Sequence, residues 1–135
     1  MIEYANENDI AGILELDGHI DQKLLKRKIS HNEVYVIREQ TEVIGILRYS
    51  LFWDNTPFMN MICIKQSFQR KGLGSLMVKH WENDMKKQGH HRVMTSTLSN
   101  EEAQHFYRKL GYKDIGGFVL PNEPLEMLFV KDISA

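Results

Sequence analysis

The chain has 135 residues, of which 42% are hydrophobic and 26% are charged. We expect one domain, residues 1–135, with its own core, and the composition excludes disordered and fibrous proteins. Seventeen Lys and Arg against 18 Asp and Glu give a net charge of −1, so there is no general attraction to nucleic acid or acidic membranes. The single cysteine excludes an internal disulfide. Without a long apolar run or a signal-peptide pattern, the chain is expected to be cytoplasmic.

The first half of the chain predicts two helices and four strands. "MIEYA" is a short strand, and "NENDIAGILELDG" predicts a helix with an Asn cap and with Ile10, Ile13 and Leu14 on one face. A weaker helix and loop follow over residues 19–32. "EVYVIREQTEVIGILRYSLFW" has the pattern of a β-hairpin, and "TPFMNMICI" predicts the next strand.

The second half predicts two helices and three strands. A helix runs from Gly72 to about Gln88, with Gly89 as its stop, and "HRVMTSTL" is a strand. "SNEEAQHFYRKLGY" predicts a helix with a capping box of Ser99 and Glu102. "YKDIGGFVL" and "LEMLFVKDI" are the last strands. In the helix predicted from Gly72 to about Gln88, the apolar face consists of Leu73, Leu76, Met77, Trp81 and Met85.

This order of elements predicts an α/β fold, an α+β mixed sheet with parallel crossovers in its middle and antiparallel hairpins at its flanks.

The segment "QRKGLGS" predicts an anion site, because a strand, a glycine-containing turn and a helix start follow one another there. Free N–H groups and the helix dipole attract an anion there, and Arg70 and Lys71 add charge, which favours a pyrophosphate. The alternative is a solvated basic turn. The motifs of Walker A loops and of dinucleotide-binding folds are both absent.

Two segments together resemble the GNAT superfamily of N-acetyltransferases. The first is Gln69-Arg70-Lys71-Gly72-Leu73-Gly74, which is similar to the signature Q/R-x-x-G-x-G/A. The second, from Asn100 to Tyr112, is similar to N-x-x-A-x-x-F-Y-x-K-x-G-[FY]. The resemblance runs from about Val34 to Tyr112. It implies a central mixed twisted sheet of about six to seven strands flanked by about four helices, with acetyl-CoA as cosubstrate.

The resemblance also implies the roles of individual residues. The backbone of Ile62, Cys63 and Ile64 would pair with the pantetheine arm, and Asn100 would hydrogen-bond the same arm. Tyr107 would lie at the thioester sulfur. On a helix that starts near Asn100, positions 100, 103 and 107 share one stripe, which fits a single elongated ligand. The residues implied around the pyrophosphate are Gln69, Arg70, Lys71, Gly72, Leu73, Gly74 and Ser75.

The expected reaction is direct attack of a primary amine on the thioester. A backbone N–H of residues 62–64 would stabilise the oxyanion, and Tyr107, with an unperturbed pKa of about 10, would protonate the departing thiolate. Some family members carry a glutamate base five residues before the Asn, where this chain has Thr95. Water or an already neutral amine could replace that base. The remaining candidate bases are Asp54, Glu123 and Glu126.

Two other functions are considered beside the enzyme: a non-catalytic acyl-CoA sensor or scaffold, and a nucleic-acid binder, which the net charge disfavours. The presence of both Asn100 and Tyr107 favours the enzyme. His90 and His91 are interpreted as a solvated turn, and Cys63 as a small buried strand residue. We expect no metal, no nucleic acid and no membrane as partners, but a small-molecule or peptide amine acceptor, in a monomer or homodimer.

Overall fold

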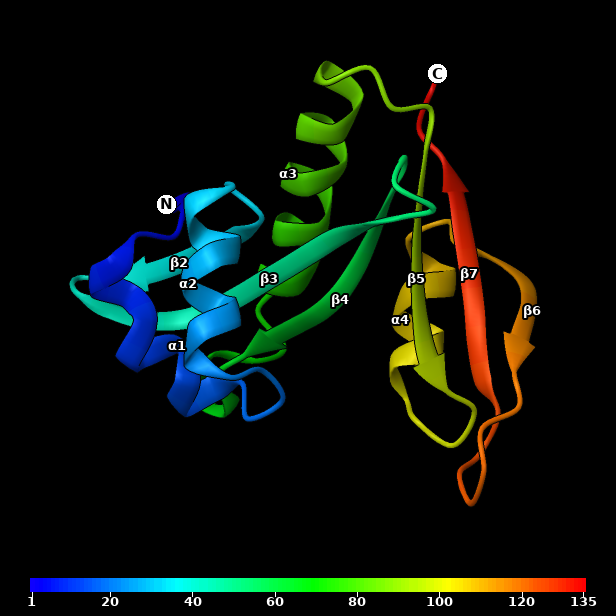
Figure 1. Ribbon diagram of the computed structural model, residues 1–135, viewed down its shortest axis with the longest axis horizontal. Helices are drawn as coiled ribbons and strands as arrows, with labels where there is room; N and C mark the ends of the chain where they lie inside the picture. The colour runs from blue at the N-terminus through cyan, green and yellow to red at the C-terminus, as the bar shows by residue number, and fades with distance from the viewer. The chain divides into compact units, whose positions relative to one another are not determined.

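The computed structural model describes residues 1–135 (Figure 1). Seven strands form a sheet in the order β1-β2-β3-β4-β5-β7-β6, accompanied by four α-helices, which confirms the predicted mixed sheet. No helix is both long and apolar enough to cross a membrane. The strands are β1 (Ile2–Tyr4), β2 (Val34–Glu39), β3 (Glu42–Phe52), β4 (Thr56–Ile64), β5 (Arg92–Leu98), β6 (Lys113–Phe118) and β7 (Glu126–Asp132). The helices are α1 (Ile10–Leu16), α2 (Gln22–Ser30), α3 (Leu73–Lys87) and α4 (Ala103–Lys109), with short 3-10 turns η1 (Glu7–Asp9) and η2 (Gln66–Phe68).

The predicted elements are all present, and the largest difference is at the start of α4. The expected capping box of Ser99 and Glu102 does not form, because the Glu102 side chain makes no capping hydrogen bond. The carboxylate of Glu101 instead accepts the backbone N–H of Leu98 at 3.0 Å. The residues just before Ala103 form this turn, and α4 begins at Ala103.

The chain divides into two compact units, and each is described by itself. Unit 1 contains Met1–Ser50 and Met61–Trp81, and unit 2 contains Leu51–Asn60 and Glu82–Ala135. Strand β4 and helix α3 therefore contribute residues to both units. The expectation of one domain over residues 1–135 stays a prediction.

The core of unit 1 lies on both faces of the antiparallel strands β1, β2 and β3. Helices α1 and α2 cover one face (Figure 1), where Ile13 and Leu25 pack with Val34, Val36 and Ile46. Alternate residues of a strand point to opposite faces. The two faces of β2 are therefore both apolar, as expected for a strand that is covered on both sides.

The other face of unit 1 is aromatic. The ring of Tyr49 lies 6.4 Å from that of Tyr35 and 5.9 Å from that of Trp81 on α3. The predicted apolar face of α3 is correct except at Leu76, which is 47% exposed, while Val78 is fully buried. The buried face of α3 is therefore rotated slightly from the predicted one.

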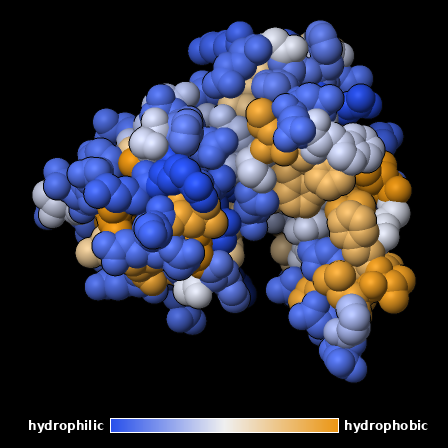
Figure 2. All heavy atoms as spheres, in the orientation of Figure 1, coloured by the Kyte–Doolittle hydropathy of each residue, from blue (hydrophilic) through white to orange (hydrophobic).

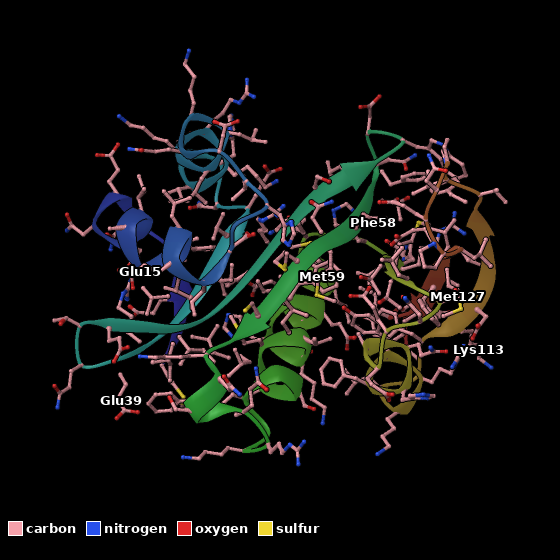
Figure 3. All side chains as sticks on the ribbon, turned by 90° about the horizontal axis from the view of Figure 1, so that it is seen from below. Glu15, Glu39, Phe58, Met59, Lys113 and Met127 are labelled. Carbon is pink, nitrogen blue, oxygen red and sulfur yellow. The ribbon has the colours of Figure 1, made fainter.

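Unit 2 combines antiparallel and parallel strands. Strand β7 pairs antiparallel with β5 on one side and β6 on the other, and β4 pairs parallel with β5 through Phe58–Met94 and Met59–Thr95. Figure 3 labels Phe58 and Met59 on β4. Helix α4 lies behind β5 in Figure 1 and ends at Lys109, just before the predicted stop Gly111, whose φ is 95°.

Candidate active site

The turn between β4 and α3, in unit 1, has the geometry of an anion site. Arg70 and Gly72 both have left-handed backbones, with φ of 63° and 81°. The Gly72 carbonyl accepts the N–H of Leu76 at 3.1 Å, which is the first hydrogen bond of the helix. The N–H groups of residues 73–75 therefore have no acceptor within the helix, as at any helix start. They are available, together with the helix dipole, to bind an anion.

Charge and space at this turn fit a pyrophosphate. Gly72 is exposed, and a Cβ placed on it would meet no atom within 4 Å, so a ligand can approach the backbone closely. Arg70 and Lys71 are exposed, and the Lys71 ammonium lies 5.4 Å from the centre of the Phe68 ring. The donors are backbone N–H groups and cations, which is the chemistry that phosphate oxygens require.

Gln69 has a structural task in the same turn. Its side-chain amide donates to the carbonyl oxygen of Ile64 at 2.8 Å, which ties the turn to the end of β4. That bond engages the Ile64 carbonyl within the protein itself. Cys63 packs against the core beneath α1 and α2, and burial raises the pKa of its thiol. Cys63 is therefore a strand residue packed against the core, as interpreted from the sequence, while Ile62 is half-buried beside it.

Tyr107, in unit 2, is only 5% exposed and packs in an aromatic cluster. Its ring centre lies 5.9 Å from those of Tyr112 and Phe129. Burial raises the pKa of Tyr107, and the nearby negative charges of Glu101 and Glu126 raise it further. The polar side chain of Thr95 opposes these effects in part. The phenol therefore carries its proton at neutral pH, as a general acid must.

Thr95 and Asn100 lie in different surroundings. Thr95 is 1% exposed on β5, and its hydroxyl donates to the carbonyl oxygen of Met59 at 3.0 Å. Asn100 is exposed in the turn before α4, so the expectation that it lies on the helix was wrong. Ala103 and Tyr107 do share one face of α4, but the predicted stripe lacks its first member because the Glu101 turn delays the helix.

A buried polar network beside Tyr107 was missed from the sequence. Glu82 is 7% exposed and accepts hydrogen bonds from the Tyr112 hydroxyl at 2.8 Å and from the Lys131 ammonium at 2.9 Å. Burial and the Glu82 charge together raise the pKa of Tyr112. Glu82 belongs to the charged segment KHWENDMKKQG, whose composition alone predicts a solvated helix face, and its burial departs from that pattern. Its spacing from Val78 and Met85 places it within the apolar stripe, and that signal could have identified it.

The three carboxylates considered as bases differ in position. Asp54 and Glu123 are exposed, whereas Glu126 is half-buried. The charge of Glu126 raises the pKa of Tyr107, so this carboxylate lies near the phenol. Among the three, Glu126 is the one that the structure relates to Tyr107.

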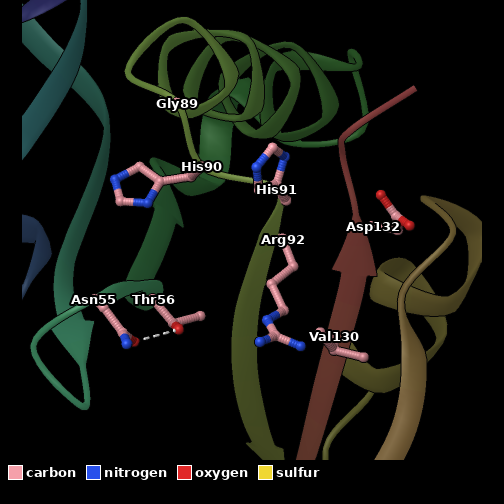
Figure 4. A pocket seen from close by; sticks show the side chains of 8 residues that line it. All are labelled: Asn55, Thr56, Gly89, His90, His91, Arg92, Val130 and Asp132. Carbon is pink, nitrogen blue, oxygen red and sulfur yellow. Dashed lines mark hydrogen bonds between the residues drawn. The ribbon is translucent and has the colours of Figure 1, made fainter.

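Unit 2 also holds a cavity of about 640 Å³ at the start of β5. Figure 4 shows His90 directed toward the Asn55 side of this cavity, where the Thr56 hydroxyl donates to the Asn55 side chain at 2.8 Å. His90 is half-buried and His91 is exposed, which agrees with a loop before a strand. The whole lining is Asn55, Thr56, Gly89, His90, His91, Arg92, Val130 and Asp132.

Apolar side chains gather on the surface of unit 2 around the connection between β6 and β7. Figure 2 shows them on the visible face. Val119 is 91% exposed, and all of β6 is exposed. The exposed apolar residues of this patch are Ile115, Phe118, Val119, Leu120 and Leu125.

Comparison with solved structures shows the same fold in several bacterial and archaeal proteins. A Bacillus cereus acetyltransferase of the GNAT family has a TM-score of 0.80 at 20% identity, covering 98% of this chain and 96% of that one. Ard1 from Thermoplasma volcanium has a TM-score of 0.87 at 15% identity, with the same coverage. The Salmonella typhimurium protein yncA, solved with its cofactor acetyl-CoA, has a TM-score of 0.83 at 17% identity and coverage of 98% and 93%.

Sequence comparison adds the family itself. A Chlorobaculum tepidum protein described as an N-acetyltransferase is 24% identical over 97 residues, which cover 68% of this chain. The match spans 60% of the length of that relative. Residues 4–112 match the family described as acetyltransferase (GNAT) family. The resemblance that was expected from two short motifs is thus confirmed over most of the sequence: the chain belongs to the GNAT family of acetyltransferases.

Proposed function

We propose that the protein transfers an acetyl group from acetyl-CoA to a primary amine, with Tyr107 as the general acid. The observation that carries this proposal is the buried, protonated phenol of Tyr107 in a chain whose 69–75 turn has the donors for a pyrophosphate. A relative of the same fold was solved with acetyl-CoA, which supports the choice of acyl donor.

In this proposal the turn in unit 1 supplies affinity. The N–H groups of residues 73–75 bind the pyrophosphate oxygens, and Arg70 and Lys71 attract the negative charge. Gly72 leaves the backbone accessible. The backbone of residues 62–64 pairs with the pantetheine arm, apart from the Ile64 carbonyl that Gln69 already engages, and Gln69 stabilises the turn rather than the ligand.

Tyr107 and the backbone of residues 62–64 supply the chemistry in this proposal. The amine nitrogen attacks the thioester carbon, and a backbone N–H of residues 62–64 donates to the oxyanion that forms. When the carbon–sulfur bond breaks, Tyr107 gives its proton to the sulfur, and a proton released by the amine restores the phenol. Asn100 remains the proposed hydrogen-bond partner of the coenzyme arm from its position in the turn before α4.

The carboxylate of Glu126 suits a cationic acceptor. Amines are protonated in water at neutral pH, and a negative charge close to the reacting centre attracts them. Thr95 cannot act as a base at neutral pH, so the amine loses its proton to Glu126 or to water. Replacing Glu126 with Gln should therefore raise KM for the amine more than KM for acetyl-CoA.

The test is thiol release from acetyl-CoA in the presence of a panel of amines. The panel contains polyamines, amino acids, aminoglycosides and peptides with free N-termini, and binding of coenzyme A is measured by calorimetry on the same protein. We expect turnover with at least one class of amine, and loss of that turnover in Tyr107→Phe. Tight coenzyme A binding without turnover of any amine would instead support a sensor or scaffold.

A further inference from the structure

The cavity at the start of β5 takes no part in the proposed reaction, and its lining is that of a ligand site. Its volume of about 640 Å³ lies within the range of small-molecule pockets. The lining comes entirely from unit 2: from the end of the β3–β4 turn, the first residue of β4, the loop between α3 and β5, the first residue of β5, and β7. None of the residues implied for coenzyme A lines this cavity, so a ligand here would be a further one.

Arg92 brings to this cavity a positive charge that no carboxylate pairs with. Arg92 lies opposite Asp132 in the antiparallel pairing of β5 with β7, so the two side chains share one face of the sheet within reach of an ion pair. The Asp132 carboxylate instead accepts the backbone N–H and the hydroxyl of Ser134, at 2.8 and 2.5 Å. Figure 4 shows the Arg92 guanidinium and the Asp132 carboxylate pointing in different directions. The guanidinium forms no hydrogen bond or ion pair within the protein, so its N–H donors are available to a ligand.

Two further donors belong to the same lining. Asn55 ends the tight turn between β3 and β4, where its N–H donates to the Phe52 carbonyl oxygen at 3.2 Å. The Thr56 hydroxyl donates to the side-chain oxygen of Asn55 at 2.8 Å, which leaves the amide NH₂ of Asn55 as the free end. The half-buried ring of His90 is directed toward this side of the cavity (Figure 4) and forms no hydrogen bond within the protein. Both groups can therefore donate to a ligand.

These donors suit a phosphate group. A guanidinium, an imidazole and a primary amide all present N–H groups, and a phosphate ester offers three acceptor oxygens with up to two negative charges. A metal ion does not fit, because His90, His91 and Asp132 do not form a group that could hold one. A water molecule takes about 30 Å³ of the liquid, so this cavity has room for an organic group beside a phosphate. The side chain of Val130 offers that group an apolar contact.

We propose that this cavity binds a small phosphomonoester, with Arg92, His90 and Asn55 as donors to its phosphate group and Val130 against its organic part. Ser134 holds the Asp132 carboxylate away from the guanidinium, so the charge of Arg92 is left for the ligand. The site is independent of acetyl transfer, since it shares no residue with the turn of residues 69–75 or with Tyr107.

An NMR titration of the full chain, labelled with ¹³C in its histidine rings, tests the proposal. The His90 signal is assigned by its absence in His90→Gln and is followed in the parent at constant pH and ionic strength. We expect a saturable shift with glycerol 3-phosphate, at lower concentration than with inorganic phosphate, and no shift with glycerol or sodium chloride. Arg92→Gln should weaken glycerol 3-phosphate binding about tenfold, the effect of a hydrogen bond to a charged group.

Two variants and one background sharpen this titration. Lys113→Gln removes an exposed cation of β6 and changes the net charge as Arg92→Gln does, so binding should stay within about twofold of the parent. Asn55→Asp replaces a donor by a negative charge and should weaken binding at least tenfold. The turn of residues 69–75 also attracts phosphate in the proposed function. In Gly72→Val the His90 shift should therefore persist unchanged. Thermal unfolding of each variant shows that it is folded.

The outcomes separate this inference from the proposed function. The inference is overturned if the His90 signal drifts without saturating, or if sodium acetate shifts it as strongly as glycerol 3-phosphate. Equal losses in Arg92→Gln and Lys113→Gln would show general charge attraction and would also overturn it, as would a shift that disappears in folded Gly72→Val. A saturable His90 shift in a protein that acetylates no amine would reject the proposed function and support this site.

Discussion

The turn of residues 69–75 and the surroundings of Tyr107 differ in almost every physical property. The turn is exposed, positively charged and built from backbone N–H groups around Gly72. Tyr107 is buried among aromatic rings, and burial raises the pKa of its hydroxyl. The first arrangement binds a highly charged group that stays partly in water. The second keeps one proton on one oxygen.

This difference separates affinity from chemistry. Exposed charges contribute modestly to binding and are weakened by salt, whereas a buried donor acts where water cannot compete. These two assignments predict that a change in the turn alters the binding of coenzyme A, and that a change at Tyr107 alters turnover. A variant in the turn and a variant at Tyr107 should therefore have different effects on coenzyme A affinity and on kcat.

The largest effect is expected from Tyr107→Phe. The variant keeps the ring that packs against Tyr112 and Phe129 and loses only the acid, so kcat should fall about 100-fold. KM for acetyl-CoA should change by less than about threefold, because the hydroxyl acts on the leaving group. Steady-state thiol release measures both. Tyr4→Phe, on the exposed strand β1, is the control and should leave kcat unchanged.

The next effect is expected from Gly72→Val. Valine at φ of 81° is strained, and its side chain would fill the open space in front of the helix start. The dissociation constant for coenzyme A should rise about tenfold, equal to about 1.4 kcal/mol. Gly89 has a similar φ of 94° and equally open space, so Gly89→Val should lower stability without weakening coenzyme A binding. Unaltered affinity in folded Gly72→Val would contradict a pyrophosphate site.

A smaller effect is expected from the two cations of the turn. Arg70→Ala and Lys71→Ala should each weaken coenzyme A binding about two- to fivefold, the range of exposed ion pairs. The loss should shrink as salt is raised, because exposed charges are screened. Calorimetry at low and high salt measures this. Lys79→Ala, an exposed cation further along α3, should have no such effect, and an equal loss there would argue for general charge attraction.

The smallest effect concerns pH. Because the pKa of Tyr107 is raised above its ordinary value, the acid stays protonated until the pH exceeds about 10. The rate should therefore rise as the acceptor amine loses its proton, without a fall below about pH 10. A pH profile of kcat/KM for the amine checks this. A falling limb near pH 8 that vanishes in Tyr107→Phe would show that the phenol titrates far lower.

Most of the fold was predictable because its elements have strong local signals. The apolar run of β4 and the end of α4 just before Gly111 were both predicted, since hydrophobic spacing and glycine stops act within a few residues. The start of α4 was not, because Glu101 competes with the expected cap by accepting the Leu98 N–H. Glu101 and Glu102 are adjacent and either carboxylate could cap a turn here, so the sequence alone does not decide which of them does.

The candidate site was predictable only for residues whose amino-acid type and local motif indicate their role. Tyr107 and the glycine turn were identified from their motifs. Thr95 was noticed as the residue in place of a glutamate base, while its hydrogen bond to Met59 depends on the pairing of β4 with β5, which no local pattern reveals. The burial of Glu82 depends on Lys131, 49 residues away in the chain. Partners at such separations are set by tertiary structure.

The most direct test measures kcat and the dissociation constant for coenzyme A side by side for Tyr107→Phe and Gly72→Val. The division between affinity and chemistry predicts that Tyr107→Phe loses about 100-fold in kcat with affinity nearly intact. Gly72→Val should lose about tenfold in affinity while keeping kcat at saturating acetyl-CoA. The opposite pattern, with weakened binding in Tyr107→Phe and full turnover once saturated, would contradict it.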